Sequence, residues 1–184
     1  MDCILLAAGS SSRMGHPKQL ITIDGKTIFR RSLELAMQCC EQVIAVEGAV
    51  SLGSEILPED NAVLLKNPDY SAGQLGSLKV GLMALRTERF FVFLADLILV
   101  QPSTFYYLAQ LEHQVVYPIC GGHPGHPVLM DKAAAALLSA ASPGKKAMDV
   151  LKPLNPFFAE VDDKGIYMDV DTRDDLERLG ESVR

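Results

Sequence analysis

The sequence lacks the marks of a membrane or exported protein. Its longest apolar run, FFVFLADLILV, contains an aspartate and is shorter than the roughly 20 residues that a membrane-spanning helix needs. The N-terminus has no basic segment followed by a long apolar stretch and a cleavage site. We therefore expect a cytoplasmic protein with no membrane partner.

Cysteine is scarce, and positive charge is not in excess. The four cysteines, Cys3, Cys39, Cys40 and Cys120, show no C-x-x-C spacing, which favours reduced thiols over a metal site or a disulfide framework. The formal net charge of −6 argues against broad binding to nucleic acid, because such binding needs a basic face. An anionic ligand would need a local cluster of positive charge.

No repeat, low-complexity tract or flexible linker divides the chain, so residues 1–184 are predicted to form one domain. Short apolar runs alternate with longer helical patterns, which is typical of an α/β sheet covered by helices. The expected strands are residues 2–7, 42–46, 61–67, 89–96, 115–122 and 126–130. The expected helices are residues 27–40, with Thr27 as its cap, 73–88, 104–112, 131–141 and 173–183. Methionines in these patterns, Met83 and Met130 among them, are expected to fill the core.

The segment after the first expected strand, AAGSSSRMGHPK, is suited to binding phosphate. Its small residues let the backbone approach a ligand, and Arg13 and Lys18 supply positive charge. Its spacing matches neither the G-x-x-x-x-G-K-[ST] phosphate loop nor the G-x-G-x-x-G fingerprint. The alternative is a solvated Gly/Ser loop with two surface cations.

A second candidate segment is NPDYSAGQLGSLKVG, which follows the third expected strand. Gly73, Gly76 and Ser77 begin a helix there, and Ser77 with the helix-start amides could meet a base or a ribose. An ordinary loop and helix cap would explain the same residues. Both segments follow strands, where an open α/β sheet binds its ligands.

Carboxylates mark two further positions. Asp96 stands among apolar residues, and burying it ionised and unpaired would cost several kcal/mol. It must therefore pair, lie at the end of the strand or bind a cation. Asp169 and Asp171 share one face if the chain is extended, an arrangement that attracts Mg²⁺. A helix capped by Asp171 or Thr172 is the alternative, although it leaves Asp169 unexplained.

The segment GGHPGHPV places His123 and His126 three residues apart. This spacing could suggest a transition metal, but the glycines and prolines equally describe a tight turn, and no further His or Cys cluster completes a coordination shell. We interpret the segment as a loop that helps to enclose a substrate.

Taken in order, LAAGSSSRMGHPKQL, NPDYSAGQLGSL, Asp96, GGHPGHPVLM and DVDTRDDL resemble the MobA-like nucleotidyltransferases, and among them the molybdenum cofactor cytidylyltransferases most. The resemblance covers nearly the whole chain. The first segment is shared with sugar-phosphate nucleotidyltransferases, but the combination is more specific. The resemblance implies a three-layer, Rossmann-like α/β fold with a mostly parallel sheet and helices on both faces.

The resemblance also implies roles for individual residues. Asp96 and Asp171 match the positions that hold Mg²⁺, and Arg13, Lys18 and Asp96 are the implied catalytic residues. Ala7, Ala8 and Gly9 match the form of the loop that goes with CTP in preference to GTP. The implied nucleotide-binding residues are Leu6, Ala7, Ala8, Gly9, Arg13, Lys18, Gly73 and Ser77.

In the implied reaction, the terminal phosphate of a molybdopterin-type acceptor attacks the α-phosphorus of CTP, or of another NTP, and releases pyrophosphate. A molybdoenzyme client would receive the product. No protein nucleophile is needed, because positioning and charge neutralisation supply most of the catalysis. This explains why the sequence shows no obvious catalytic Ser, Cys or His.

The chain departs from the family pattern in three places. An arginine that many relatives have is replaced by Ser10. Relatives have Gly-Asp-x-Pro where this chain reads ADLILV, which begins with Ala95 and Asp96. The stretch PGKKAMDVL lacks the Asp and Arg that relatives often carry there. Two alternatives therefore stay open. One is transfer to a sugar phosphate or another phosphorylated acceptor, and the other is a maturation factor that binds nucleotide or cofactor without turnover.

Overall fold

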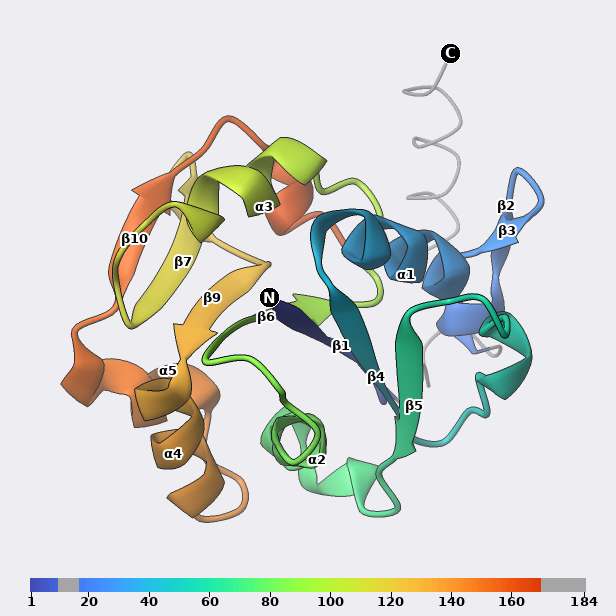
Figure 1. The fold of residues 1–184 in the computed structure, drawn as a ribbon, viewed down its shortest axis with the longest axis horizontal. Coiled ribbons are helices and arrows are strands. Elements are labelled where there is room, and N and C mark those ends of the chain that lie inside the picture. The colour runs from blue at the N-terminus through green and yellow to red at the C-terminus, as the bar shows by residue number, and fades with distance from the viewer. Residues whose placement is uncertain (10–16, 170–184) are drawn as a thin grey trace.

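The computed structural model describes residues 1–9 and 17–169. It has a central sheet with helices on both faces (Figure 1). The strands are β1 (Asp2–Ala7), β2 (Thr22–Ile23), β3 (Lys26–Thr27), β4 (Gln42–Glu47), β5 (Ala62–Lys66), β6 (Arg89–Leu94), β7 (Val115–Cys120), β8 (His123–Pro124), β9 (Val128–Asp131) and β10 (Phe157–Glu160). The helices are α1 (Ile28–Cys39), α2 (Gln74–Leu82), α3 (Pro102–Ala109), α4 (Lys132–Ala140) and α5 (Ala147–Leu151). Short 3-10 helices span Lys18–Leu20, Gly53–Glu55, Tyr70–Ala72, Lys152–Leu154 and Lys164–Ile166.

The main sheet is mostly parallel, as predicted. Its strand order is β10-β7-β9-β6-β1-β4-β5, and β8 pairs with β7. The strands β5, β4, β1 and β6 are mutually parallel, and β10 is parallel to β7. Strand β9 is antiparallel to both of its neighbours, β6 and β7. The carboxyl ends of β1, β4 and β6 therefore lie at one edge of the sheet, which is where such sheets bind ligands.

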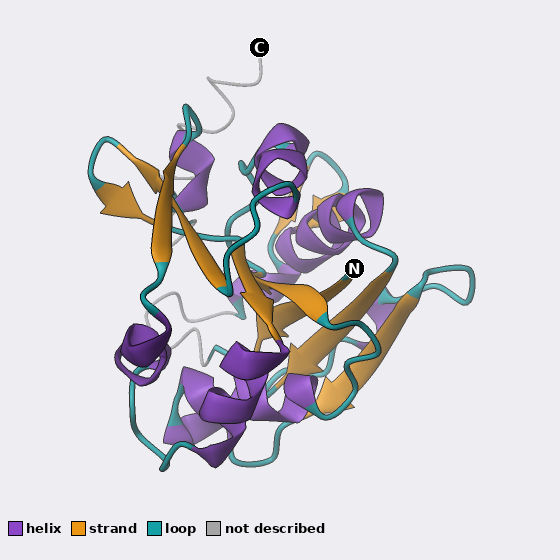
Figure 2. Ribbon diagram, turned by 60° about the vertical axis from the view of Figure 1, so that its left-hand side comes forward, coloured by secondary structure: helices purple, strands orange, loops and turns teal. Residues whose placement is uncertain are grey.

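Helices lie on both faces of the sheet and give the fold three layers (Figure 2). Apolar side chains on both faces of the sheet hold these layers together. Along the fully buried strand β1, Cys3 and Leu5 belong to the core beneath α1 and α3, whereas Ile4 and Leu6 belong to the core beneath α2, α4 and α5. This burial on both sides explains why the strand sequences are apolar without alternation. In the described part of the chain, no helix has the length and the apolar character needed to cross a bilayer.

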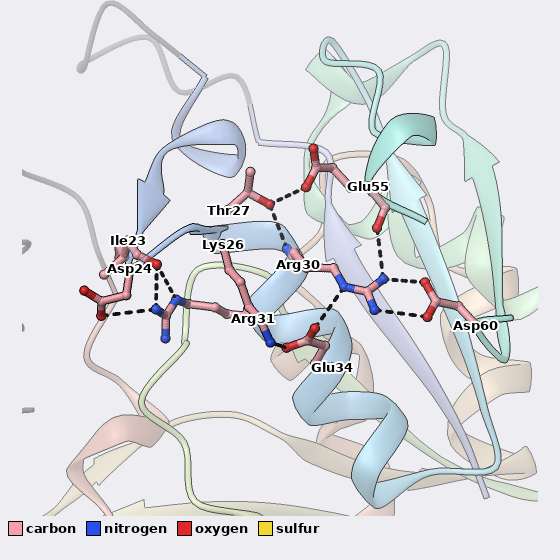
Figure 3. A network of polar contacts seen from close by, with 9 residues as sticks. All are labelled: Ile23, Asp24, Lys26, Thr27, Arg30, Arg31, Glu34, Glu55 and Asp60. Atoms are coloured by element: carbon pink, nitrogen blue, oxygen red, sulfur yellow. Dashed lines mark hydrogen bonds and ion pairs between the residues drawn. The ribbon is translucent and has the colours of Figure 1, made fainter. Parts of the chain in front are cut away.

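Helix α1 begins where the sequence predicts, because the Thr27 hydroxyl accepts a hydrogen bond from Arg30 N at 3.1 Å. Figure 3 shows the polar network that α1 carries. The Arg30 guanidinium pairs with both carboxylate oxygens of Asp60 and donates to the Glu55 carbonyl oxygen at 3.1 Å. Arg31 donates to the Ile23 carbonyl oxygen. The network therefore fixes both the β2–β3 hairpin and the segment after β4 to one helix.

Several local predictions were wrong. Helix α2 ends at Leu82 rather than near residue 88, because the backbone amides of Arg86 and Thr87 donate to Asp2 Oδ2 at 2.7 and 3.3 Å and turn the chain into β6. Met83, just beyond α2, is 81% exposed instead of filling the core, whereas Met130 is buried as expected. Strand β10, helix α5 and the β2–β3 hairpin were not predicted. The expected helix 173–183 lies outside the described residues.

Candidate active site

A cavity of about 490 Å³ lies at the carboxyl ends of β1 and β6. Its lining comes from the end of β1, the start of α2 and the residues after β6: Leu6, Ala8, Gly9, Tyr70, Ser71, Gly73, Gln74, Ser77, Leu94 and Asp96. The structure thus brings together six of the residues singled out in the sequence, from three distant segments. Ala7, between Leu6 and Ala8, is directed instead into the core beneath α1.

The described end of the opening loop is held by Gln19, a residue that the sequence reading missed. Gln19 is almost completely buried, and its Nε2 donates to the carbonyl oxygens of Ala7 at 3.0 Å and Gly9 at 2.8 Å. Gly48 packs against the same loop, because a Cβ there would lie 2.8 Å from the Ala8 carbonyl oxygen. Gly48 follows β4 directly, so it could have been predicted from the rule that ligands bind beyond strand ends. The position of Gln19 in the sequence gives no such indication.

The opposite wall is the start of α2. Asn67 Nδ2 donates to Ser77 Oγ at 2.9 Å, and Asn67 Oδ1 accepts from Asp69 N at 3.0 Å. These bonds tie the end of β5 to the first turn of α2 and fix Ser77 at the cavity wall. Gly73 precedes the helix with φ of 104°, a conformation that favours glycine.

Asp96 lies two residues beyond the end of β6 and pairs with Lys18. Pairing was one of the three explanations that the sequence offered for this carboxylate. Lys18 Nζ lies 2.7 Å from Asp96 Oδ2, and the two side chains are 15% and 24% exposed. The other carboxylate oxygen, Asp96 Oδ1, is buried and has no hydrogen-bond partner among the described residues. Since an unpartnered buried carboxylate oxygen is costly, Asp96 is suited to a cation or a further donor in the cavity.

Two of the expected phosphate and metal residues, Arg13 and Asp171, lie outside the described residues, as does Ser10. Asp169 is described and exposed. Within residues 1–9 and 17–169, no group of three or more His, Cys, Asp or Glu side chains is placed to hold a metal. Of the two residues that match the family's Mg²⁺ positions, Asp96 is therefore the one whose surroundings the structure describes.

A second cavity, of about 460 Å³, shares Leu6, Gly73 and Gln74 with the first. His126, from the GGHPGHPV segment, lines it, and its Nδ1 lies 3.1 Å from the Val92 carbonyl oxygen. Burial lowers the pKa of His126, opposed by the Val92 carbonyl and by the charge of Asp96. His123 is exposed and lies against the ring of Tyr167, with centroids 5.4 Å apart. The two histidines thus have different surroundings.

The cavity lies beyond the carboxyl ends of the parallel strands, which is where α/β proteins of the doubly wound class bind nucleotides. Residues 3–159 match the MobA-like NTP transferase domain, and the chain belongs to this family. It is accordingly a nucleotidyltransferase.

Individual relatives agree with this assignment. The chain is 30% identical over 179 residues to the molybdenum cofactor cytidylyltransferase of Escherichia coli K12, covering 96% of this chain and 93% of that one. It is 26% identical over 160 residues to a probable molybdenum cofactor guanylyltransferase of Chloroflexus aggregans, covering 82% of this chain and 75% of the relative.

Solved structures show the same fold. Rv0371c from Mycobacterium tuberculosis H37Rv superposes with a TM-score of 0.82 at 24% identity, covering 98% of each chain. A structure of Rv0371c in complex with manganese gives a TM-score of 0.78 at 23% identity, again covering 98% of each chain. The three-layer nucleotidyltransferase fold expected from the sequence is therefore confirmed.

Proposed function

We propose that the protein transfers CMP from CTP to the terminal phosphate of molybdopterin and releases pyrophosphate. The observation that carries this proposal is the first cavity, which gathers Leu6, Ala8, Gly9, Gly73, Ser77 and Asp96 around one space. Similarity over most of the chain to a molybdenum cofactor cytidylyltransferase supports the acceptor, and the loop form Ala7-Ala8-Gly9 supports CTP over GTP.

In this proposal the nucleotide lies between the opening loop and the start of α2. Lys18 binds a phosphate oxygen of the nucleotide and, with Arg13, offsets its negative charge, while Ser77 and the backbone near Ala8 and Gly9 hold the base and ribose. An oxygen of the acceptor phosphate attacks the α-phosphorus, a new P–O bond forms, and the oxygen between the α- and β-phosphorus leaves with pyrophosphate. Orientation and charge neutralisation drive this exchange without a protein nucleophile.

Asp96 is the proposed ligand of Mg²⁺, together with Asp171. The buried, unpartnered Asp96 Oδ1 fits that role, because hard cations prefer carboxylate oxygens. A bound Mg²⁺ would neutralise phosphate charge as it develops in the reaction. The manganese complex of Rv0371c supports a divalent metal at this fold.

The proposed setting is the cytoplasm, with a molybdoenzyme as the client that receives the dinucleotide cofactor. All four cysteines, Cys3, Cys39, Cys40 and Cys120, are free thiols, which suits a reducing compartment.

The test is pyrophosphate release from each of CTP, GTP, ATP and UTP in the presence of Mg²⁺ and molybdopterin. We expect release with CTP to exceed release with the other three. Tight CTP binding without release from any nucleotide would contradict catalysis and favour a binding protein. Release with a sugar phosphate but not with molybdopterin would contradict the acceptor.

A further inference from the structure

The second cavity has mostly apolar walls. Side chains from α2 and from the neighbouring strands β6 and β9 form these walls: Leu75, Leu78, Val92, Val128 and Met130. Lys145 and Lys146 line the same cavity from the segment before α5. Because the cavity shares Leu6, Gly73 and Gln74 with the nucleotide cavity, a group bound here would lie next to the nucleotide.

His126 presents a hydrogen-bond acceptor to this cavity. Its backbone N–H donates to the Ile166 carbonyl oxygen at 2.8 Å, which fixes the residue, and its ring Nδ1 lies 3.1 Å from the Val92 carbonyl oxygen. A carbonyl oxygen can only accept, so Nδ1 carries the proton and Nε2 carries a lone pair. No side chain or backbone group in the described ranges donates to Nε2. Burial lowers the pKa of His126 and so favours this neutral form.

Tyr117 supplies a second polar group to the same cavity. Its ring stacks on Phe158 with centroids 5.6 Å apart, and burial raises the pKa of its hydroxyl to about 12, so it stays protonated. The hydroxyl can donate or accept. Besides the two lysines, the cavity thus combines apolar walls with the His126 acceptor and the Tyr117 hydroxyl, a combination that suits a ring with N–H groups better than a sugar, whose two faces carry hydroxyls.

We propose that this cavity receives the heterocyclic part of the acceptor and that His126 is a specificity-determining residue, whose Nε2 accepts a hydrogen bond from a ring N–H or amino group. This inference rests on the proposed function, because a pterin is an acceptor group with that chemistry. An acceptor that lacked the donor would leave Nε2 unpaired inside the complex and would bind more weakly.

The test measures binding of the fluorescent probe pterin-6-carboxylate to the full chain and to three variants. His126→Asn keeps a donor that can reach the Val92 carbonyl but removes the acceptor at the Nε2 position. His126→Gln places an amide oxygen near that position. His123→Asn is the matched control, because His123 lies in the same turn but lines neither cavity. Urea unfolding and CTP binding check that each variant is folded and keeps its nucleotide site.

We expect His126→Asn to weaken pterin-6-carboxylate binding about tenfold, the size of one lost hydrogen bond. His126→Gln should recover part of this loss, and His123→Asn should match the wild type. Binding of 2-naphthoate, which is flat but has no N–H group, should be the same in the wild type and in His126→Asn.

Equal pterin binding by the wild type and His126→Asn, or no pterin binding by the wild type, would overturn the inference. Either result would leave the proposed reaction standing if the wild type still released pyrophosphate from CTP and molybdopterin. Conversely, pterin binding that depends on His126 would support the inference even if no pyrophosphate were released.

Discussion

At the scale of single residues, the two oxygens of Asp96 have different environments. Oδ2 pairs with Lys18 at 2.7 Å, whereas Oδ1 is buried without a partner in the described part of the chain. A carboxylate held in this way is oriented by the lysine before any ligand arrives. Its remaining oxygen is then available to a cation.

We predict that Asp96→Asn will lower kcat by about 100-fold or more, because the neutral amide is a poor ligand for Mg²⁺ and removes the charge that orients Lys18. Steady-state pyrophosphate release at saturating CTP measures this effect. The control is Asp162→Asn, an exposed carboxylate that lines neither this cavity nor the second one, which should keep wild-type activity. Full activity of Asp96→Asn would remove Asp96 from the proposed catalytic residues.

A second prediction concerns Gln19, whose amide donates to the carbonyl oxygens of Ala7 and Gly9. Gln19→Glu keeps the size of the side chain but replaces the donor with an oxygen that repels both carbonyls. We expect KM for CTP to rise about tenfold, with a smaller change in kcat, because each lost bond is worth about 1 kcal/mol. An unchanged KM would mean that the described end of the loop keeps its position without Gln19.

At the scale of elements, α1 organises the part of the protein next to the opening loop. Through Arg30 it contacts Asp60 and Glu55, and through Arg31 it holds the β2–β3 hairpin (Figure 3). The hairpin immediately follows the 3-10 helix that contains Lys18 and Gln19. The network therefore holds in place the hairpin that follows Lys18 and Gln19, although none of its members lines either cavity.

We predict that Asp60→Asn will lower the free energy of unfolding by about 1–2 kcal/mol at pH 7, because it breaks a partly buried, two-pronged ion pair. The Arg30 guanidinium lowers the pKa of Asp60 in the folded protein. The stabilisation is therefore complete above the unfolded pKa, near 4, and is lost as the pH falls through the lower folded pKa.

Urea unfolding of the wild type and Asp60→Asn at several pH values measures this prediction, and the difference between them should shrink below about pH 4. Asp24→Asn is the matched control, since Asp24 also pairs with an arginine of α1 but its side chain is 76% exposed. It should change stability by less than about 0.5 kcal/mol. A constant difference between wild type and Asp60→Asn at every pH would show that the charge of Asp60 is unimportant.

At the scale of the whole molecule, the first cavity, which is the proposed nucleotide site, exists only in the folded chain, because its lining comes from segments 6–9, 70–77 and 94–96. A ligand that binds only this assembled form stabilises it, by about 2.7 kcal/mol at one hundred times its dissociation constant. We predict a larger rise in Tm with CTP and Mg²⁺ than with GTP, ATP or UTP, measured by thermal shift. Removing Mg²⁺ with a chelator should reduce the rise, and equal shifts for all four nucleotides would contradict the preference for CTP.

Much of this architecture could be predicted from local sequence. Strands such as β1 and β6 are apolar because both of their faces are buried, and the segments that follow them carry the residues that meet around the cavity. Strand β10 could not be found in this way, because only Ala159 of its four residues is buried. The insertion of antiparallel β9 between β6 and β7 depends on contacts distant in sequence, and no local periodicity encodes it. The role of Gln19 could not be predicted for a similar reason. No local pattern distinguishes a buried glutamine that donates to two backbone carbonyls from a glutamine on the surface.

Because β9 supplies the second neighbour of β6, the chain passes through a vulnerable stage during synthesis. The parallel strands β1, β4, β5 and β6 are complete once residue 94 has emerged from the ribosome, but the strand that covers the open side of β6 begins at residue 128. Until then the run FFVFL offers unpaired backbone groups and an apolar, β-prone surface to any other nascent chain. Arg89 and Asp96 flank this run, and charges at such positions disfavour aggregation. Asp96, which lines the first cavity of the folded chain, is thus one of the two charges that border this run.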